Sequence, residues 1–282
     1  MKRFFVFLGV VLATIGSAVR AQEVDSIAQL QKSSWGDAKT EETAEYIPEI
    51  SIHSRMGYEH DFLEQVGRFD GNGLYLGIDG NISPNFSYSF YHCIASSDSQ
   101  GLFGFDNTQW LTVSYENDWL NLTAGKNAVM VGSFEYDGYD IDSYYFMNSS
   151  FWNSFDCWQW GASASFYPDD DHELTIQVCN SPFSFGEPNL FAYALGWRGE
   201  MEWFESLWTA NMWQYDKGSY MKSMNFANRF DFDDFSFDLE YMTRATDIKD
   251  LFTRDFTLMI APTYQFSDWG RITGRFGWEK GG

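Results

Sequence analysis

The chain has 282 residues and a formal net charge of -22, with 18 Lys and Arg against 40 Asp and Glu. This balance excludes a nucleic-acid-binding surface, which requires clustered Lys and Arg. Mean hydropathy is -0.35, and beyond the N-terminal segment no apolar run reaches the ~18–20 residues of a membrane-spanning helix. A membrane protein with this sequence would therefore have to be a β-barrel, for which an aromatic content of 20% is natural.

The N-terminal segment has the layout of a secretory signal peptide. It begins with Lys2 and Arg3, continues through an apolar run over 4–15, and ends in small residues up to Ala21. The following residues are polar and charged. The expected organisation is a signal peptide over 1–21, a periplasmic lead-in over 22–45 and an outer-membrane β-barrel over 46–282.

Alternating runs of about ten residues recur from Tyr46 onward, the length that a tilted strand needs to cross a bilayer. They predict thirteen strands, over 47–60, 73–82, 86–95, 108–116, 119–127, 156–167, 173–181, 190–200, 205–216, 222–232, 235–245, 254–266 and 270–279. Single-chain bacterial barrels have an even strand number. We therefore expect an antiparallel up-and-down β-barrel of about 14–16 strands, with either a strand uncounted or the C-terminus truncated.

The expected connections alternate in length. Short turns are predicted at 83–85, 116–118, 168–172, 200–203, 233–234 and 267–270, and longer links at 61–72, 96–107, 128–155, 182–189, 217–221 and 246–253. Outer-membrane barrels sort their connections in this way, with short periplasmic turns and long extracellular loops. The pattern favours a barrel over a soluble β-sandwich.

The two faces of the strands also differ. In the run 173–181, one face carries Leu174, Ile176 and Val178, and the other carries Thr175 and Gln177. The second faces are too polar for the dry core of a sandwich. We expect the apolar face to contact lipid and the polar face to line a water-filled lumen.

The segment LTAGKNAVMVGSFEYDGYDIDSYYF, residues 122–146, resembles the phosphate-selective porin O and P family, particularly its Bacteroidetes branch. The matching residues are Gly125, Lys126, Gly132, Ser133, Phe134 and Glu135. The segment WQWGASASFYPDDDHELTIQVCNSPFS looks similar too, and the resemblance covers most of the chain from Tyr46 to Trp278. It implies a trimeric channel, without enzyme activity, whose third loop folds into the pore. Phosphate-selective members rely on Lys and Arg along the pore, which this chain carries sparingly, so the family label is no evidence of phosphate binding.

Channels select ions by charges at their narrowest part. The expected constriction carries Glu135, Asp137, Asp140, Asp142 and Lys126. The expected pore lining carries Arg55, Arg198, Arg229, Arg244, Arg271, Arg275, Asp238 and Glu240. The alternatives are a solvated acidic loop at 128–155 and, for each arginine, a salt bridge to a lumen carboxylate.

These features predict an outer-membrane porin for passive diffusion of small hydrophilic solutes or ions. The expected partners are outer-membrane lipid, the solutes and two further copies in a homo-trimer; we expect no cofactor or metal. The channel should be weakly cation-preferring or nearly unselective, and neutralising Glu205 beside a short turn should leave its selectivity unchanged.

Two other classes of protein compete with a porin. A surface-binding or adhesion barrel would act through its outer loops. A membrane hydrolase would need a Ser–His pair, for which Ser51 and His53 are the best match. The acidic stretches at 70–73 and 169–171 lack the spacing of a known calcium loop and are read as turns.

Overall fold

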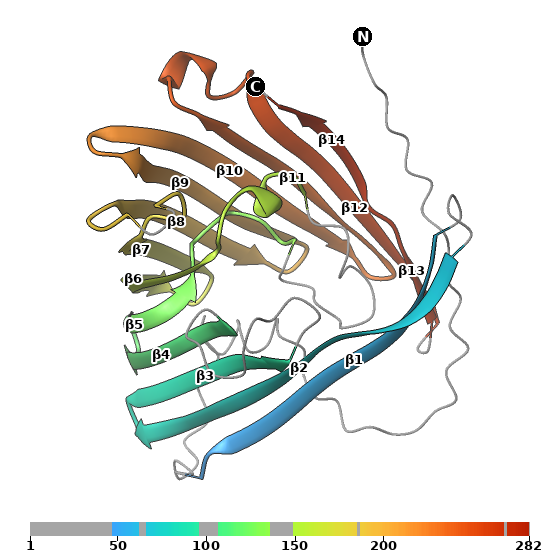
Figure 1. The fold of residues 1–282 in the computed structure, drawn as a ribbon, viewed down its shortest axis with the longest axis horizontal. Helices are drawn as coiled ribbons and strands as arrows, with labels where there is room; N and C mark the ends of the chain where they lie inside the picture. Colours follow the sequence, from blue (N-terminus) through green and yellow to red (C-terminus); the bar gives the residue numbers. More distant parts are fainter. Residues whose placement is uncertain are drawn as a thin grey trace.

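The computed structural model describes residues 47–61, 66–95, 107–135, 149–184, 187–267 and 270–281. They form one antiparallel sheet of fourteen strands, in which the strands from β1 to β13 pair in chain order and β14 pairs with β12. The sheet curves around the segment that joins β5 to β6 (Figure 1). The signal peptide over 1–21 and the lead-in over 22–45 lie outside the described residues.

The strands are β1 (Glu49–Asp61), β2 (Val66–Ser83), β3 (Phe86–Ala95), β4 (Thr108–Asn117), β5 (Leu120–Ala128), β6 (Trp158–Asp169), β7 (His172–Asn180), β8 (Phe191–Met201), β9 (Phe204–Asp216), β10 (Ser219–Phe232), β11 (Phe235–Ala245), β12 (Asp255–Ser267), β13 (Gly270–Thr273) and β14 (Phe276–Lys280). The described residues also form the short 3-10 helices η2 (Trp152–Ser154) and η3 (Ile248–Asp250). No described helix is long and apolar enough to span a membrane.

The predicted all-β, antiparallel up-and-down arrangement is confirmed. Each of the thirteen predicted runs coincides with a strand, except that the run 270–279 is divided into β13 and β14. The backbone N–H of Gly274 still donates to Pro262 O at 2.9 Å across the break. Among the described residues, β1 does not pair with β13 or β14.

Two predicted links are wrong in length. The link expected over 61–72 is largely strand, since β2 begins at Val66. The stretch 70–73, expected as a turn, forms a bulge instead: Arg55 pairs with Gly73 and Met56 with Gly71, which leaves Asn72 between them. The link expected over 217–221 is a tight turn in which Gly218 has φ +78°.

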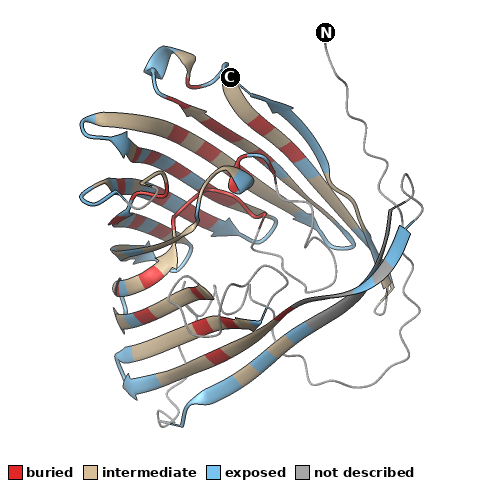
Figure 2. Ribbon diagram, in the orientation of Figure 1, coloured by how far each residue is buried: buried red, intermediate tan, exposed pale blue. Residues whose placement is uncertain are grey.

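The predicted division between the two faces of the strands is confirmed, and it is inverted relative to a water-soluble protein. On β7, the apolar Leu174, Ile176 and Val178 are 39%, 48% and 47% exposed, whereas Glu173 and Thr175 are buried. The hairpin of β4 and β5 follows the same rule, with Val113 and Leu122 exposed and Thr112 and Thr123 buried. Figure 2 shows buried and exposed residues alternating along β7 to β9.

Exposed aromatic side chains gather beside the short turns at one end of the sheet. They are Phe86, Trp119, Phe166, Trp203, Phe235 and Phe266. Aromatic rings prefer the boundary between hydrocarbon and water, where their apolar body and polarisable face are both accommodated. This end therefore has the composition of an interfacial girdle.

Candidate functional site

The segment that joins β5 to β6 lies on the concave face of the sheet, and we call its described residues 129–135 and 149–157 the inner segment (Figure 1). We call the concave face of the sheet the wall. Side chains of the wall form hydrogen bonds with the backbone of the inner segment. Gln177 on β7 accepts from the N–H of Met130 at 2.8 Å and donates to Ala128 O at 2.9 Å. Thr209 on β9 accepts from the N–H of Gly132 at 2.8 Å. Polar side chains of the wall thus form the hydrogen bonds that these backbone N–H and C=O groups do not make within the loop itself.

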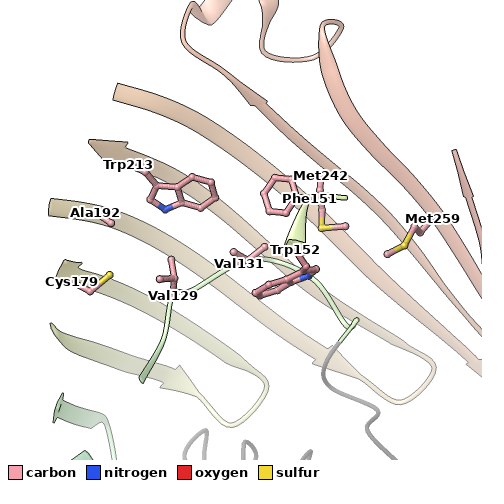
Figure 3. Packing of buried hydrophobic residues seen from close by; sticks show 9 residues of the cluster. All are labelled: Val129, Val131, Phe151, Trp152, Cys179, Ala192, Trp213, Met242 and Met259. Atoms are coloured by element: carbon pink, nitrogen blue, oxygen red, sulfur yellow. The ribbon is translucent and has the colours of Figure 1, made fainter. Parts of the chain in front are cut away.

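Apolar side chains fasten the inner segment to the wall as well (Figure 3). Val129, Val131, Phe151 and Trp152 are all buried in one cluster. The wall contributes Cys179, Ala192, Trp213, Met242 and Met259, from β7, β8, β9, β11 and β12. Burying a large apolar side chain contributes about 1.5–3 kcal/mol, so this cluster is a strong anchor for the inner segment.

Gly132 lies where the inner segment closely approaches the backbone of the wall. A Cβ on this residue would lie 2.7 Å from Leu207 O, 3.0 Å from Thr209 N and 3.1 Å from Asn225 O. These are backbone atoms of β9 and β10, which cannot move aside as a flexible side chain would. Only glycine fits this contact.

The two residues after Gly132 each contact a side chain of the wall. Ser133 Oγ donates to Glu240 Oε2 at 2.5 Å and accepts from Trp152 Nε1 at 3.2 Å. Phe134 is buried, and the guanidinium carbon of Arg229 lies 4.3 Å from its ring centroid.

Glu135 ties the two described limbs of the inner segment together. Its carboxylate accepts from Ser149 N at 2.5 Å and from Ser149 Oγ at 2.7 Å, and Arg275 Nη2 lies 3.7 Å away. Burial raises the pKa of Glu135, and the Arg275 charge and the Ser149 hydrogen bonds oppose this shift without cancelling it. The side chain has 0% exposure, so Glu135 acts as a buried structural group at the base of residues 136–148.

The other predicted constriction residues divide into two groups. Asp137, Asp140 and Asp142 lie outside the described residues. Lys126 is buried on β5, opposite Leu111 and Trp160 of the adjacent strands. The preceding Gly125 has φ +138°, and a Cβ there would overlap the Leu111 carbonyl oxygen. The backbone conformation and the close contact with β4 therefore both require glycine at this position.

Charged side chains of the inner wall alternate in sign across five neighbouring strands. This charge belt consists of Glu173 on β7, Arg198 on β8, Glu205 on β9, Arg229 on β10 and Asp238 on β11. Arg198 donates to Glu205 through Nη2, while Arg229 reaches Glu205 Oε2 at 3.4 Å. Arg229 also forms a two-pronged pair with Asp238, at 2.8 and 3.2 Å.

The register of the sheet explains the belt. Glu173 lies opposite Arg198, and Arg229 lies between Glu205 and Asp238 in the ladders of β9, β10 and β11. Cross-strand neighbours of opposite charge stabilise a sheet pair. Arg198, Arg229 and Asp238 were predicted as pore-lining residues from the sequence. Glu173 and Glu205 were not, because the strand register decides their partners.

The remaining predicted lining residues have different surroundings. Arg244 pairs with Asp255 at 2.8 Å and donates to Ser154 of the inner segment. Glu240 is buried beneath Ser133. Arg271 is exposed at the short-turn end of the sheet, and the side chain of Arg55 is outside the described part of the structure.

The arrangement offers no hydrolytic pair at Ser51. In the described part of the chain, neither Ser51 Oγ nor His53 Nε2 has a hydrogen-bond partner, so the two side chains do not bond to each other. The described residues also contain no cluster of three or more His, Cys, Asp or Glu suited to a metal ion. The stretch 169–171 is the β6–β7 turn, in which Asp169 accepts from His172 Nδ1 at 2.6 Å.

No protein-family model matches the sequence, and no curated protein matches it. The structure is similar to solved outer-membrane proteins at low sequence identity. The outer-membrane channel DcaP of Acinetobacter baumannii is 8% identical with a TM-score of 0.43, over 82% of this chain and 90% of that one. OpdQ of Pseudomonas aeruginosa is 12% identical with a TM-score of 0.46, over 83% and 69%.

A mutant form of the Rh. blastica porin is 9% identical with a TM-score of 0.43, over 81% of this chain and 94% of that one. These values describe a likeness to porins and channels of the outer membrane and define no specific family.

Proposed function

We propose that this protein is a porin of the outer membrane of a Gram-negative bacterium, which lets small hydrophilic solutes or ions diffuse passively. The observation that carries the proposal is the inversion of the two faces, seen on β7, where Ile176 and Val178 are exposed and Glu173 and Thr175 are buried. A continuous apolar outer face is unfavourable in water and favourable in hydrocarbon. A polar inner face has the reverse preference.

The inner segment supports a channel rather than a filled barrel. It is held against one side of the wall by Gly132, Ser133 and the apolar cluster, as a loop that narrows a pore would be. We propose that the acids that follow it, Asp137, Asp140 and Asp142, form the constriction, with Glu135 at their base. Lys126 is the nearest base along the chain.

Weak cation preference follows from how the wall arginines are compensated. Arg198, Arg229, Arg244 and Arg275 each lie within 4 Å of a carboxylate. Their positive charge is therefore largely balanced within the wall. The acids of the constriction then decide the sign of the selectivity, since fixed charges at the narrowest point act on ions that have lost part of their water.

The finer assignments rest on the sequence resemblance. The motif from Gly125 to Glu135 supports a relationship to the phosphate-selective porin O and P family and, with it, a homo-trimer. Phosphate selectivity is not part of the proposal, because the motif residues described here serve packing and hydrogen bonding within the protein. The expectation of no enzyme activity and no cofactor is retained.

Single-channel recording in planar bilayers tests the proposal. The mature protein, purified from outer membranes, should give stable conductance steps, and a salt gradient should give a reversal potential near zero or on the cation side. Gel mobility before and after heating would report the oligomer. Folded protein that gives no conductance would refute the channel and favour the surface-binding or adhesion barrel.

A further inference from the structure

Five cationic side chains gather at the long-loop end of β9 to β14, and we call them the cationic rim. They are Lys217 in the β9–β10 turn, Lys222 on β10, Lys249 and Arg254 between β11 and β12, and Lys280 at the end of β14. Four of them are exposed and Lys222 is half-buried. Three acids, Asp216, Asp247 and Asp250, lie among these cations. Two more adjoin them but are engaged on the inner side, where Asp255 pairs with Arg244 and Glu279 accepts from the N–H of Ser150. This end is therefore locally positive on a chain whose net charge is -22.

The outer faces of two strands lead up to the rim in the same order. On β14, the outward residues are Phe276, Trp278 and then Lys280, opposite Ile260, Leu258 and Phe256 of β12. Phe276 and Trp278 are 62% and 65% exposed. On β10, the outward residues toward the rim are Phe226, Met224 and then Lys222. Each strand thus presents two apolar side chains followed by one ammonium group.

The loop between β11 and β12 contacts the lysines of both β10 and β14 at the rim. Lys222 Nζ donates to Thr246 O at 2.8 Å, and Lys280 Nζ donates to Thr253 O at 2.6 Å, so the two ammonium groups flank the same loop. The loop also exposes Ile248 and Phe252, at 61% and 46%. Exposed apolar residues beside cations are typical of a surface that contacts a membrane interface.

Two of the acids at the rim already have partners other than Lys222 and Lys280. Asp250 pairs with Arg254 at 3.3 Å, and Asp247 accepts from the backbone N–H of Lys249 at 3.0 Å. Within the part of the chain that the structure describes, Lys222 and Lys280 donate to neutral backbone carbonyl groups and form no ion pair with either carboxylate. The ammonium groups at the two ends of the loop therefore retain donors for an anion.

We propose that the cationic rim binds the phosphate groups of an outer-leaflet glycolipid, the lipopolysaccharide of the Gram-negative surface, with its acyl chains along the apolar faces of β10, β12 and β14. The inference rests on the proposed location in the outer membrane. Lysine ammonium groups bind phosphate as point charges. The apolar residues below them favour a lipid over a free phosphate ion, which needs no such surface.

Native mass spectrometry of the full-length protein in detergent tests the inference, with bis-phosphorylated lipid A and its dephosphorylated form as probes. The wild type should bind the phosphorylated lipid, and the dephosphorylated lipid at least tenfold more weakly. The K222Q/K249Q/K280Q variant should lose at least tenfold in affinity, given several-fold per cation near a lipid surface. The K222R/K249R/K280R variant keeps the charge and should bind as the wild type does.

Equal binding of the two lipids, or unchanged binding by the Gln variant, would overturn the inference. If the Gln variant does not fold, binding by the wild type across a salt series gives the answer, because an electrostatic site must weaken as salt rises. Conductance of the same preparation separates the two proposals. If the protein conducts but binds both lipids equally, only the proposal of a lipid site at the cationic rim is refuted. If it binds the phosphorylated lipid but does not conduct, only the proposal of a channel is refuted.

Discussion

The Glu135 carboxylate accepts hydrogen bonds from both the backbone N–H and the hydroxyl of Ser149, fourteen residues beyond it in the inner segment. One fully buried side chain therefore joins the two described limbs of the inner segment. Arg275, which precedes β14, carries the opposite charge, and its Nη2 lies 3.7 Å from Glu135 Oε2. This contact links the position of the inner segment to the C-terminal strands.

The raised pKa of Glu135 gives a pH dependence with a defined sign. The folded state holds the proton more tightly than the unfolded state, so the free energy of unfolding should fall as pH rises from the ordinary value of 4.5 into the raised range. Urea unfolding in detergent at several pH values measures this slope. Glu135→Gln should make it shallower, while Glu187→Gln, at an exposed position, should leave it unchanged. A steeper slope in Glu135→Gln would contradict the assignment.

Gly132→Ala should detach the inner segment from the wall. The added methyl meets backbone atoms of β9 and β10 within 2.7–3.1 Å, and overpacking of this kind costs about 1–3 kcal/mol. We expect a lower unfolding temperature and larger, noisier conductance steps. Gly277→Ala is the matched control, because its Cβ would lie at an ordinary 3.7 Å from Met259. Equal behaviour of the two variants would show that the contact at Gly132 is dispensable.

Glu205→Gln should move the reversal potential toward anions. The sequence alone suggested that this residue is neutral for selectivity, but its carboxylate accepts from Arg198 and lies 3.4 Å from Arg229. Neutralising it leaves Arg198 and Arg229 against only Glu173 and Asp238, so the formal charge of the belt changes from -1 to 0 and the wall becomes less attractive to cations. Glu202→Gln, in the exposed β8–β9 turn, removes the same charge and should have no effect. A null result for Glu205→Gln would place the belt away from the conduction path.

The constriction is tested by neutralising Glu135, Asp137, Asp140 and Asp142 to Gln and Asn. Loss of these charges should shift the reversal potential toward anions, because fixed charge near a narrow passage is weakly screened. Comparison with Glu135→Gln alone isolates the three aspartates, since the buried Glu135 contributes chiefly to stability. An unmodified pore that already prefers anions would refute the proposed selectivity.

Much of the fold was predictable because its rule is local. In a strand, successive side chains point to opposite faces. The apolar Leu174 and the polar Thr175 therefore indicate the outer and inner faces of their strand, whichever strands lie beside it. The tight turn at 233–234 is also a local feature, whereas the turn at Gly218 was predicted as a longer link and the bulge at Asn72 was predicted as a turn. A bulge depends on the partner strand, and the stretch 70–73 therefore looked like a turn.

The sequence by itself determined the period-two strands, their antiparallel order and the apolar outer face, because each depends on residues a few positions apart. Only the tertiary structure decided what Ser133, Glu135 and Gly132 do. Their partners Glu240, Arg275 and Leu207 are separated from them by at least 75 residues. It likewise decided that Arg229 is paired with Asp238 and Glu205, because strand register brings those charges together and no spacing along the chain encodes it.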